Sequence, residues 1–164
     1  MDKTDLSILA ELERDGRQPF AGLVERVGLS KTPCWTRVQA MERDGAIRGY
    51  HADVDPAALG LGVAAYVQVM IDFPQREAFE KAVLDHPAII ECATVAGEAD
   101  YILKVVCGDV GDLDDLLRRS LSLLPGLQRS TTMISLKSIK TRGSMVAAAQ
   151  SRPARIQAGS GLST

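Results

Sequence analysis

Three helical stripes of apolar residues open the chain. Apolar positions recur at helical spacing over Asp5–Arg14, over Phe20–Val27 and again after Ser30. Asp15-Gly16 ends the first stripe, and Gly28 directly follows the second, as a glycine at a helix C-terminus does. Ser30 can cap the third helix with its hydroxyl. The third helix is expected to bury the face formed by Cys34, Val38 and Met41.

A second pattern begins after a short polar strand or hairpin around Ile47–Val54 and a hinge at Gly60-Leu61-Gly62. From residue 63 onward, stretches of alternating apolar and polar positions are separated by helical stripes. The predicted elements are strand 63–72, helix Gln75–Asp85, strand Ile89–Val95, strand Tyr101–Val106, helix Asp109–Leu124 and strand Gln128–Ser138. The order βαββαβ is that of a ferredoxin-like domain, with two helices on one face of an antiparallel sheet.

We therefore expect an α+β chain in four parts. A helix-turn-helix domain occupies residues 1–50, and an interdomain strand and hinge occupy residues 51–62. The βαββαβ domain follows over residues 63–140. Residues 141–164 are rich in Gly, Ser, Ala and Arg and predict a flexible tail, with some helix near Ser144–Gln150.

Charge and cysteine usage restrict the class of protein. The net charge is −2, and residues 1–50 hold 8 Lys and Arg against 8 Asp and Glu. A DNA-binding surface therefore requires basic side chains gathered on one face of a neutral domain. Three well-separated cysteines (Cys34, Cys92 and Cys107) favour a reducing compartment over a disulfide framework or a zinc site. Without a signal-peptide pattern or an apolar run near the about 20 residues of a membrane helix, we expect a cytoplasmic protein with no membrane contact.

The second and third helices have the arrangement of a helix-turn-helix, whose second helix enters the major groove. Lys31, Arg37 and Arg48 are the candidate positive contacts. Ser30 and the free backbone N–H groups at the helix start suit a phosphate. The full set of candidate DNA-contacting residues is Ser30, Lys31, Thr32, Trp35, Thr36, Arg37, Gln39 and Arg48.

The polar side of the third helix also suits base recognition. Thr32, Thr36 and Gln39 carry donors and acceptors that can read base edges. Trp35 either contacts DNA or packs its indole on a neighbouring helix, and the sequence leaves both open. A small three-helix bundle used for protein contacts is the alternative for the whole segment, although the pattern favours DNA.

Several segments together resemble the Lrp/AsnC, or feast/famine, transcription regulators. They are Asp2–Leu9, Asp15-Gly16-Arg17, Gly28–Val38, Asp44–Tyr50, Asp55-Pro56, Leu59–Gly62, Gly97–Tyr101 and Pro125-Gly126. The resemblance spans residues 2–140, and the order and spacing of the motifs make it specific. It implies an N-terminal winged helix-turn-helix, an interdomain strand and a C-terminal ferredoxin-like βαββαβ effector domain. It also implies homodimers formed through the sheets, which assemble to tetramers or octamers.

The resemblance further implies a free amino acid as effector, bound near the Gly97–Tyr101 turn and the last strand. A glycine-rich turn supplies backbone donors and acceptors for a zwitterion, and Glu98 or Asp100 can face its ammonium. Hydroxyls of Thr131 and Thr132 can complete the cleft. Ordinary hairpin chemistry and strand propensity explain the same residues without a ligand. The candidate effector-binding residues are Gly97, Glu98, Ala99, Asp100, Tyr101, Thr131 and Thr132.

Catalysis is not expected. The chain shows no base–nucleophile set, phosphate loop or metal cluster, and no ligand-like spacing joins His51 and His86. We therefore expect no cofactor and no metal. Two functions remain: a sequence-specific DNA-binding regulator modulated by an amino acid, or an architectural DNA-binding protein without an effector.

Overall fold

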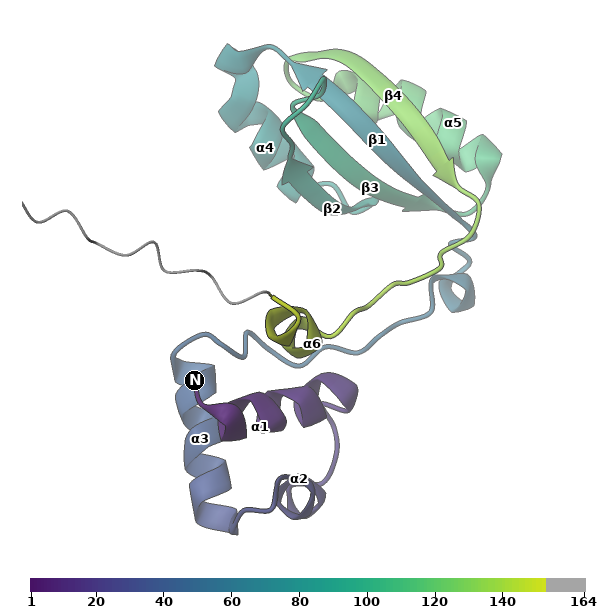
Figure 1. Ribbon diagram of the computed structural model, residues 1–164. Coiled ribbons are helices and arrows are strands. Elements are labelled where there is room, and N and C mark those ends of the chain that lie inside the picture. Colours follow the sequence, from purple (N-terminus) through teal and green to yellow (C-terminus); the bar gives the residue numbers. More distant parts are fainter. Residues whose placement is uncertain (153–164) are drawn as a thin grey trace, which may run out of the picture. The chain divides into compact units, whose positions relative to one another are not determined.

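The computed structural model describes residues 1–152, which divide into two units (Figure 1). One unit comprises Met1–Ala52 with the described residues from Lys140 onward, and the other comprises Asp53–Ile139. Among residues 1–152, no helix combines the length and the apolar character that a membrane crossing requires.

Residues 1–52 of the first unit form three helices, as the sequence predicts: α1 (Lys3–Arg14), α2 (Phe20–Val27) and α3 (Lys31–Arg43). The apolar stripes meet in one small core, because each helix turns its stripe toward the other two. The buried residues of this core are Ile8, Leu23, Cys34, Val38 and Met41. The predicted buried face of the third helix is thus confirmed.

The helix ends follow from local chemistry. At the start of α1, the Asp2 side chain accepts a hydrogen bond from the Asp5 N–H, and the Asp5 side chain accepts one from the Asp2 N–H. This reciprocal pair is a capping box. Gly28 closes α2 at a φ of 67°, a left-handed conformation that favours glycine. Ser30 takes the N-cap position of α3, but the predicted cap through its hydroxyl is wrong. The helix begins instead with the Ser30 carbonyl, which accepts a hydrogen bond from the Cys34 N–H at 3.3 Å.

Of two connecting segments, one differs from expectation and one agrees with it. The strand or hairpin predicted over Ile47–Val54 is not formed, because a strand needs a paired neighbour and no described residue supplies one. The helix predicted near Ser144–Gln150 is confirmed as α6 (Met145–Gln150), which packs on α1 with Val146 buried. Residues 153–164 of that predicted tail lie outside the described residues.

The second unit has the predicted βαββαβ order. Its elements are β1 (Val63–Ile71), α4 (Arg76–Leu84), β2 (Ile89–Thr94), β3 (Tyr101–Cys107), α5 (Val110–Arg119) and β4 (Leu127–Ser135). Helix α5 is shorter than predicted, because the chain leaves it at Ser120 and continues as a 3-10 turn over Leu121–Leu123.

The four strands form one antiparallel sheet in the order β2-β3-β1-β4. Val67 at the centre of β1 pairs with Leu103 of β3 and with Thr132 of β4. Helices α4 and α5 cover one face of the sheet and bury alternate residues of β1 and β3, whereas the described residues of this unit leave the other face uncovered (Figure 1). The ferredoxin-like fold predicted for this part of the chain is therefore confirmed.

Candidate DNA interface and effector cleft

Helix α3 presents a polar face to solvent. Its buried side packs into the three-helix core, and the side chains predicted to face a DNA groove lie on the opposite, exposed side. These exposed residues are Lys31, Thr32, Trp35, Thr36 and Gln39. The helix therefore separates a packing face from a contact face, as a recognition helix must.

The hydrogen bonds on this face leave acceptors free. The Thr36 hydroxyl donates to the Thr32 carbonyl at 3.0 Å, and Gln39 Nε2 donates to Glu42 Oε2 at 2.8 Å. The Thr36 hydroxyl oxygen and the Gln39 amide oxygen stay available to accept a bond from a base edge. Trp35 is 55% exposed, so a large part of its surface stays accessible to DNA.

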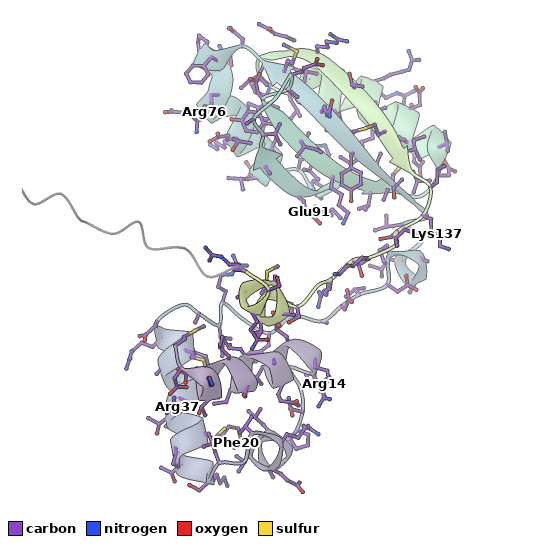
Figure 2. The ribbon with its side chains drawn as sticks, viewed as in Figure 1. Arg14, Phe20, Arg37, Arg76, Glu91 and Lys137 are labelled. Carbon is purple, nitrogen blue, oxygen red and sulfur yellow. The ribbon has the colours of Figure 1, made fainter. Side chains whose placement is uncertain are left out.

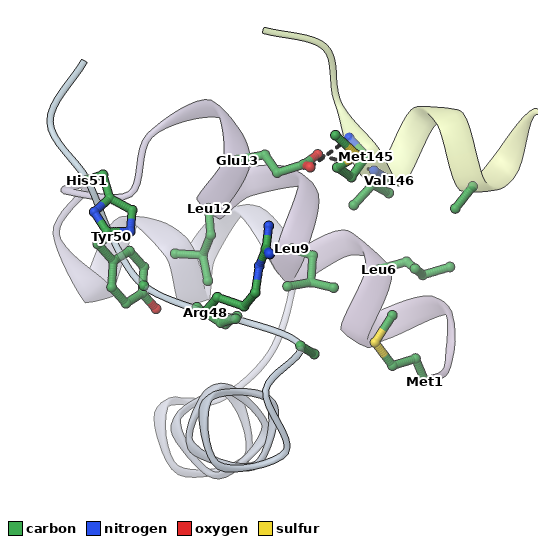
Figure 3. A pocket seen from close by; sticks show the side chains of 14 residues that line it. Met1, Leu6, Leu9, Leu12, Glu13, Arg48, Tyr50, His51, Met145 and Val146 are labelled. Atoms are coloured by element: carbon green, nitrogen blue, oxygen red, sulfur yellow. Dashed lines mark hydrogen bonds between the residues drawn. The ribbon is translucent and has the colours of Figure 1, made fainter. Parts of the chain in front are cut away.

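The three predicted cations have different surroundings. Lys31 makes no ion pair among residues 1–152 and stays available to a phosphate. Arg48 lines a cavity of about 710 Å³ together with Leu9 of α1 (Figure 3). Arg37 turns toward the start of α1, where one guanidinium nitrogen lies 2.7 Å from Asp2 Oδ2 and 2.6 Å from Asp5 Oδ1 (Figure 2). The face predicted from sequence thus keeps one unpaired cation on α3 itself, Lys31.

A cleft of about 350 Å³ lies at the turn between β2 and β3. Its walls contain three of the predicted effector residues, Gly97, Glu98 and Ala99, together with Gln68 of β1. The Glu98 carboxylate has no hydrogen bond or ion pair among the described residues, so it is free to pair with a ligand ammonium. The Gln68 amide adds a donor and an acceptor to the lining of the same cleft.

Asp100 and Tyr101 form hydrogen bonds within the second unit. The Asp100 carboxylate accepts a hydrogen bond from the Ile71 N–H at 2.9 Å, which joins the turn to the end of β1. Tyr101 points to the helix-covered face, where its ring is buried beside Phe79, and its hydroxyl donates to Glu80 Oε1 at 2.6 Å. Neither residue lines the cleft.

The two threonines of β4 lie on opposite faces of the sheet, because successive strand residues alternate. Thr131 pairs with Gln68 on the uncovered face, and Thr132 pairs with the buried Val67 on the helix-covered face. Only Thr131 therefore shares a face with the cleft. Sequence reasoning missed Gln68, although its place between Val67 and Val69 in an alternating strand already put it on the outward face.

One histidine–serine pair appears that the sequence did not indicate. His86 Nε2 lies 2.6 Å from Ser120 Oγ, while His86 Nδ1 accepts a hydrogen bond from the Ala88 N–H. In the neutral ring the proton is then on Nε2, which donates to the hydroxyl and cannot remove its proton. The pair joins the ends of α4 and α5 and does not form a general-base dyad. Across residues 1–152, no group of three or more His, Cys, Asp or Glu side chains is arranged to hold a metal ion.

Two family profiles match the chain. The profile of the winged helix-turn-helix DNA-binding domain matches residues 1–48, and that of the Lrp/AsnC ligand binding domain matches residues 64–145. The proline dehydrogenase transcriptional activator of Rhodobacter capsulatus is 36% identical over 147 residues, which is 88% of this chain and 96% of the relative. The leucine-responsive regulatory protein of Escherichia coli is 36% identical over 149 residues, 89% of this chain and 91% of the relative.

Solved structures agree with these sequence matches. A transcriptional regulator of Neisseria meningitidis in complex with L-methionine superposes with a TM-score of 0.85 at 33% identity, covering 88% of this chain and 96% of that one. An AsnC family transcriptional regulator of Agrobacterium tumefaciens superposes with a TM-score of 0.80 at 31% identity. The match covers 86% of this chain and 94% of that one.

An exposed recognition helix combined with a separate ligand-binding domain is typical of one class of protein. This class is the DNA-binding transcription regulators that contain a ligand-binding domain in the same chain. The chain belongs to the Lrp/AsnC family of transcriptional regulators, as the order of its motifs implied. Its relatives act as regulators of transcription.

Proposed function

We propose that α3 reads operator DNA through its exposed polar face and that a free amino acid bound at the β2–β3 turn modulates this binding. The observation that carries the proposal is the two-sided α3, with Cys34, Val38 and Met41 buried and the opposite face exposed and polar. Thr32, Thr36 and Gln39 read base edges in this arrangement, and Trp35 contacts sugar or base faces. Lys31 and the N–H groups at Ser30 hold phosphate. Arg48 is a further candidate for a phosphate outside α3.

The effector cleft is assigned to the 350 Å³ cleft rather than to the larger cavity beside α1. An amino-acid zwitterion needs a negative partner, donors for its carboxylate and little competition from internal pairs. Glu98 is unpaired at the smaller cleft, whereas Glu13 at the larger cavity is already bonded to α6. A methionine complex of a similar regulator supports an amino acid as the ligand class.

The uncovered sheet face is the proposed homodimer interface. Tyr66, Met70 and Met133 lie on it with 38%, 38% and 44% of their surface exposed. A sheet face with exposed aromatic and apolar side chains is stabilised when a second copy covers it. We propose that these dimers assemble to tetramers or octamers, as the motif resemblance implies. We also propose a cytoplasmic location, because a regulator of transcription acts where operator DNA is accessible.

Operator selection from random duplexes tests the DNA-binding proposal. Purified protein is expected to enrich discrete sites, with half-sites spaced by about one helical turn. Thr36→Ala removes one hydroxyl contact and is expected to lose about 0.5–1.5 kcal/mol of discrimination at one base position. Glu77→Gln, an exposed change on α4, serves as the matched control. Uniform coverage of all duplexes with no preferred site would favour the architectural alternative.

A thermal-shift screen against the free amino acids tests the effector proposal, because a ligand that binds the folded state raises the melting temperature. Loss of the charged acceptor in Glu98→Gln is expected to cost about 1.5–3 kcal/mol of binding. A Cβ added at Gly97 meets no atom within 4 Å, so Gly97→Ala keeps the fold and narrows the cleft. A chain that none of the amino acids stabilises, and whose operator affinity none of them changes, has no amino-acid effector.

A further inference from the structure

Arg37 connects two elements that are distant in sequence. Its guanidinium extends from α3 to the first turn of α1, where it contacts carboxylates 35 and 32 residues earlier in the chain. The distances of 2.7 Å to Asp2 and 2.6 Å to Asp5 are those of charge-assisted hydrogen bonds. The Arg37 side chain keeps 37% of its surface exposed and the Asp5 side chain 16%, so this clamp lies at the edge of the α1–α3 contact.

The two acceptors of the Arg37 clamp are themselves fixed. Asp2 and Asp5 form the capping box of α1, with backbone-to-carboxylate bonds of 2.9 Å in both directions. The bond from the Asp5 N–H, followed by the bond from Arg37, holds the pKa of the Asp2 carboxyl below its ordinary value. The Asp2 carboxylate therefore stays ionised and in place at neutral pH. To reach a phosphate, the Arg37 guanidinium would have to break its bonds to two carboxylates that are already held in place.

Arg37 also stands next to Val38, which is buried in the three-helix core. Because the Arg37 side chain is bonded to the start of α1, it restricts the rotation of α3 about its own axis. The direction in which Thr36 and Gln39 project toward a groove depends on that rotation. By contrast, Lys31 has no internal partner and can move to a phosphate without breaking any bond.

We infer that Arg37 is a positioning residue, and that its clamp with Asp2 and Asp5 sets the orientation in which α3 reads its operator. This inference rests on the proposed function. It assigns two acidic residues a necessary part in binding a polyanion, which is the opposite of what their charge alone predicts. It also removes Arg37 from the set of phosphate contacts.

Removing the acidic charges of Asp2 and Asp5 tests the direction in which operator affinity changes. Asn remains a good N-cap residue, so Asp2→Asn keeps the helix start and removes one charged partner of Arg37. The double variant Asp2→Asn, Asp5→Asn is expected to bind operator on the order of ten-fold more weakly, because both charge-assisted bonds are lost. Its affinity for unrelated duplex is expected to stay equal or to rise. The matched control is Glu25→Gln on α2, which removes an unpaired negative charge and is expected to leave operator affinity equal or higher.

The salt dependence of binding separates positioning from phosphate contact. A lost phosphate contact lowers the slope of log affinity against log salt by about one for each binding protomer. Arg37→Gln is expected to weaken operator binding with an unchanged slope, whereas Lys31→Gln is expected to lower the slope. Ile8→Val in the core controls for stability alone, and at a temperature well below melting it is expected to keep the ratio of operator to unrelated-duplex affinity.

Two results would overturn the inference: tighter operator binding by the double Asp variant, or a reduced salt slope for Arg37→Gln. A wild-type protein that binds no selected duplex would overturn the proposed function itself, and this outcome is visible before any substitution is made.

Discussion

Tyr101 is a residue whose role changed between sequence and structure. The turn motif predicts it beside the effector, but its ring lies 4.8 Å from that of Phe79 in the core. Burial, followed by the bond to Glu80, raises the pKa of the Tyr101 hydroxyl, and that bond in turn lowers the pKa of Glu80. Arg76 completes the group through its ion pair with Glu80. Tyr101 thus anchors the end of the turn that carries Glu98.

Tyr101→Phe is expected to keep the ring packing and lose one hydrogen bond. Glu80 retains Arg76 as its partner, so the free energy of unfolding is expected to fall by about 0.5–1.5 kcal/mol. Denaturant unfolding measures this loss. Effector affinity is expected to stay unchanged. A large loss of affinity in Tyr101→Phe would mean that the hydroxyl reaches the ligand.

At the residue scale, local periodicity predicted the core of the first unit well. Cys34, Val38 and Met41 recur at helical spacing, which is a property of the sequence alone. The contacts of Arg37 with Asp2 and Asp5 could not be predicted in this way. They depend on how α3 crosses α1, and no local pattern encodes a pairing between residues more than 30 positions apart.

At the scale of elements, α6 is held on α1 by one carboxylate. Glu13 accepts bonds from the Met145 N–H at 2.7 Å and the Val146 N–H at 3.3 Å (Figure 3). It also accepts a bond from the Ser144 hydroxyl at 2.5 Å. Burial opposes ionisation, but these three bonds together hold the pKa of Glu13 below its ordinary value of 4.5. A six-residue helix is too short to persist alone, so its order depends on this contact.

The docking of α6 is expected to depend on pH. Because the pKa of Glu13 is lower in the folded state, its contribution is complete above about 4.5, the ordinary value, and is lost as the pH falls through the folded value. The hydrogen-exchange protection of residues 145–150, taken relative to the intrinsic rate at each pH, is expected to fall on acidification in wild type. In Glu13→Gln this protection is expected to be low throughout and to lose its pH dependence. Glu25→Gln is the control, and equal protection of α6 in both variants would contradict the role given to Glu13.

The turn before β4 requires glycine. Gly126 has a φ of 70°, and a Cβ there would lie 2.5 Å from the Gln75 Cβ. Its carbonyl also accepts a hydrogen bond from the Asp72 N–H at 2.7 Å.

Gly126→Ala is therefore expected to lower the free energy of unfolding by about 2–4 kcal/mol, since strain and overpacking add. Chemical denaturation measures the loss. At Gly97→Ala, where space is open, the change is expected to be well under about 1 kcal/mol. Equal losses for the two variants would contradict this explanation.

The order of elements in the second unit was predictable, because the switch from helical to alternating periodicity marks each strand. The missing strand over Ile47–Val54 was not, since a polar segment of strand-like composition pairs only if a neighbour is present. Helix α6 was predicted near Ser144–Gln150, but its docking on α1 depends on a partner surface that local composition does not contain.

At the scale of the whole molecule, the uncovered sheet face matters because it is the proposed interface between two copies of the chain. If it is the dimer interface, a charge at its centre is expected to separate the copies, because an unpaired buried charge is strongly destabilising. Met133→Glu is therefore expected to shift the protein toward monomer in light scattering. Leu84→Glu, at an exposed position of α4 on the helix-covered side, is expected to leave the dimer intact. A dimer that survives Met133→Glu would place the interface elsewhere.

The sequence by itself determined the class of protein. The 3.6-residue and two-residue periods specify which faces are buried, and the turn residues specify where elements end, so the βαββαβ order and the helix-turn-helix follow from local rules. Only the tertiary structure decided which polar residues remain available. It assigned Arg37, Asp100 and Tyr101 to internal partners and brought Gln68 to the wall of the cleft. Such pairings arise from the crossing of helices and the register of strands, which join residues far apart in the chain.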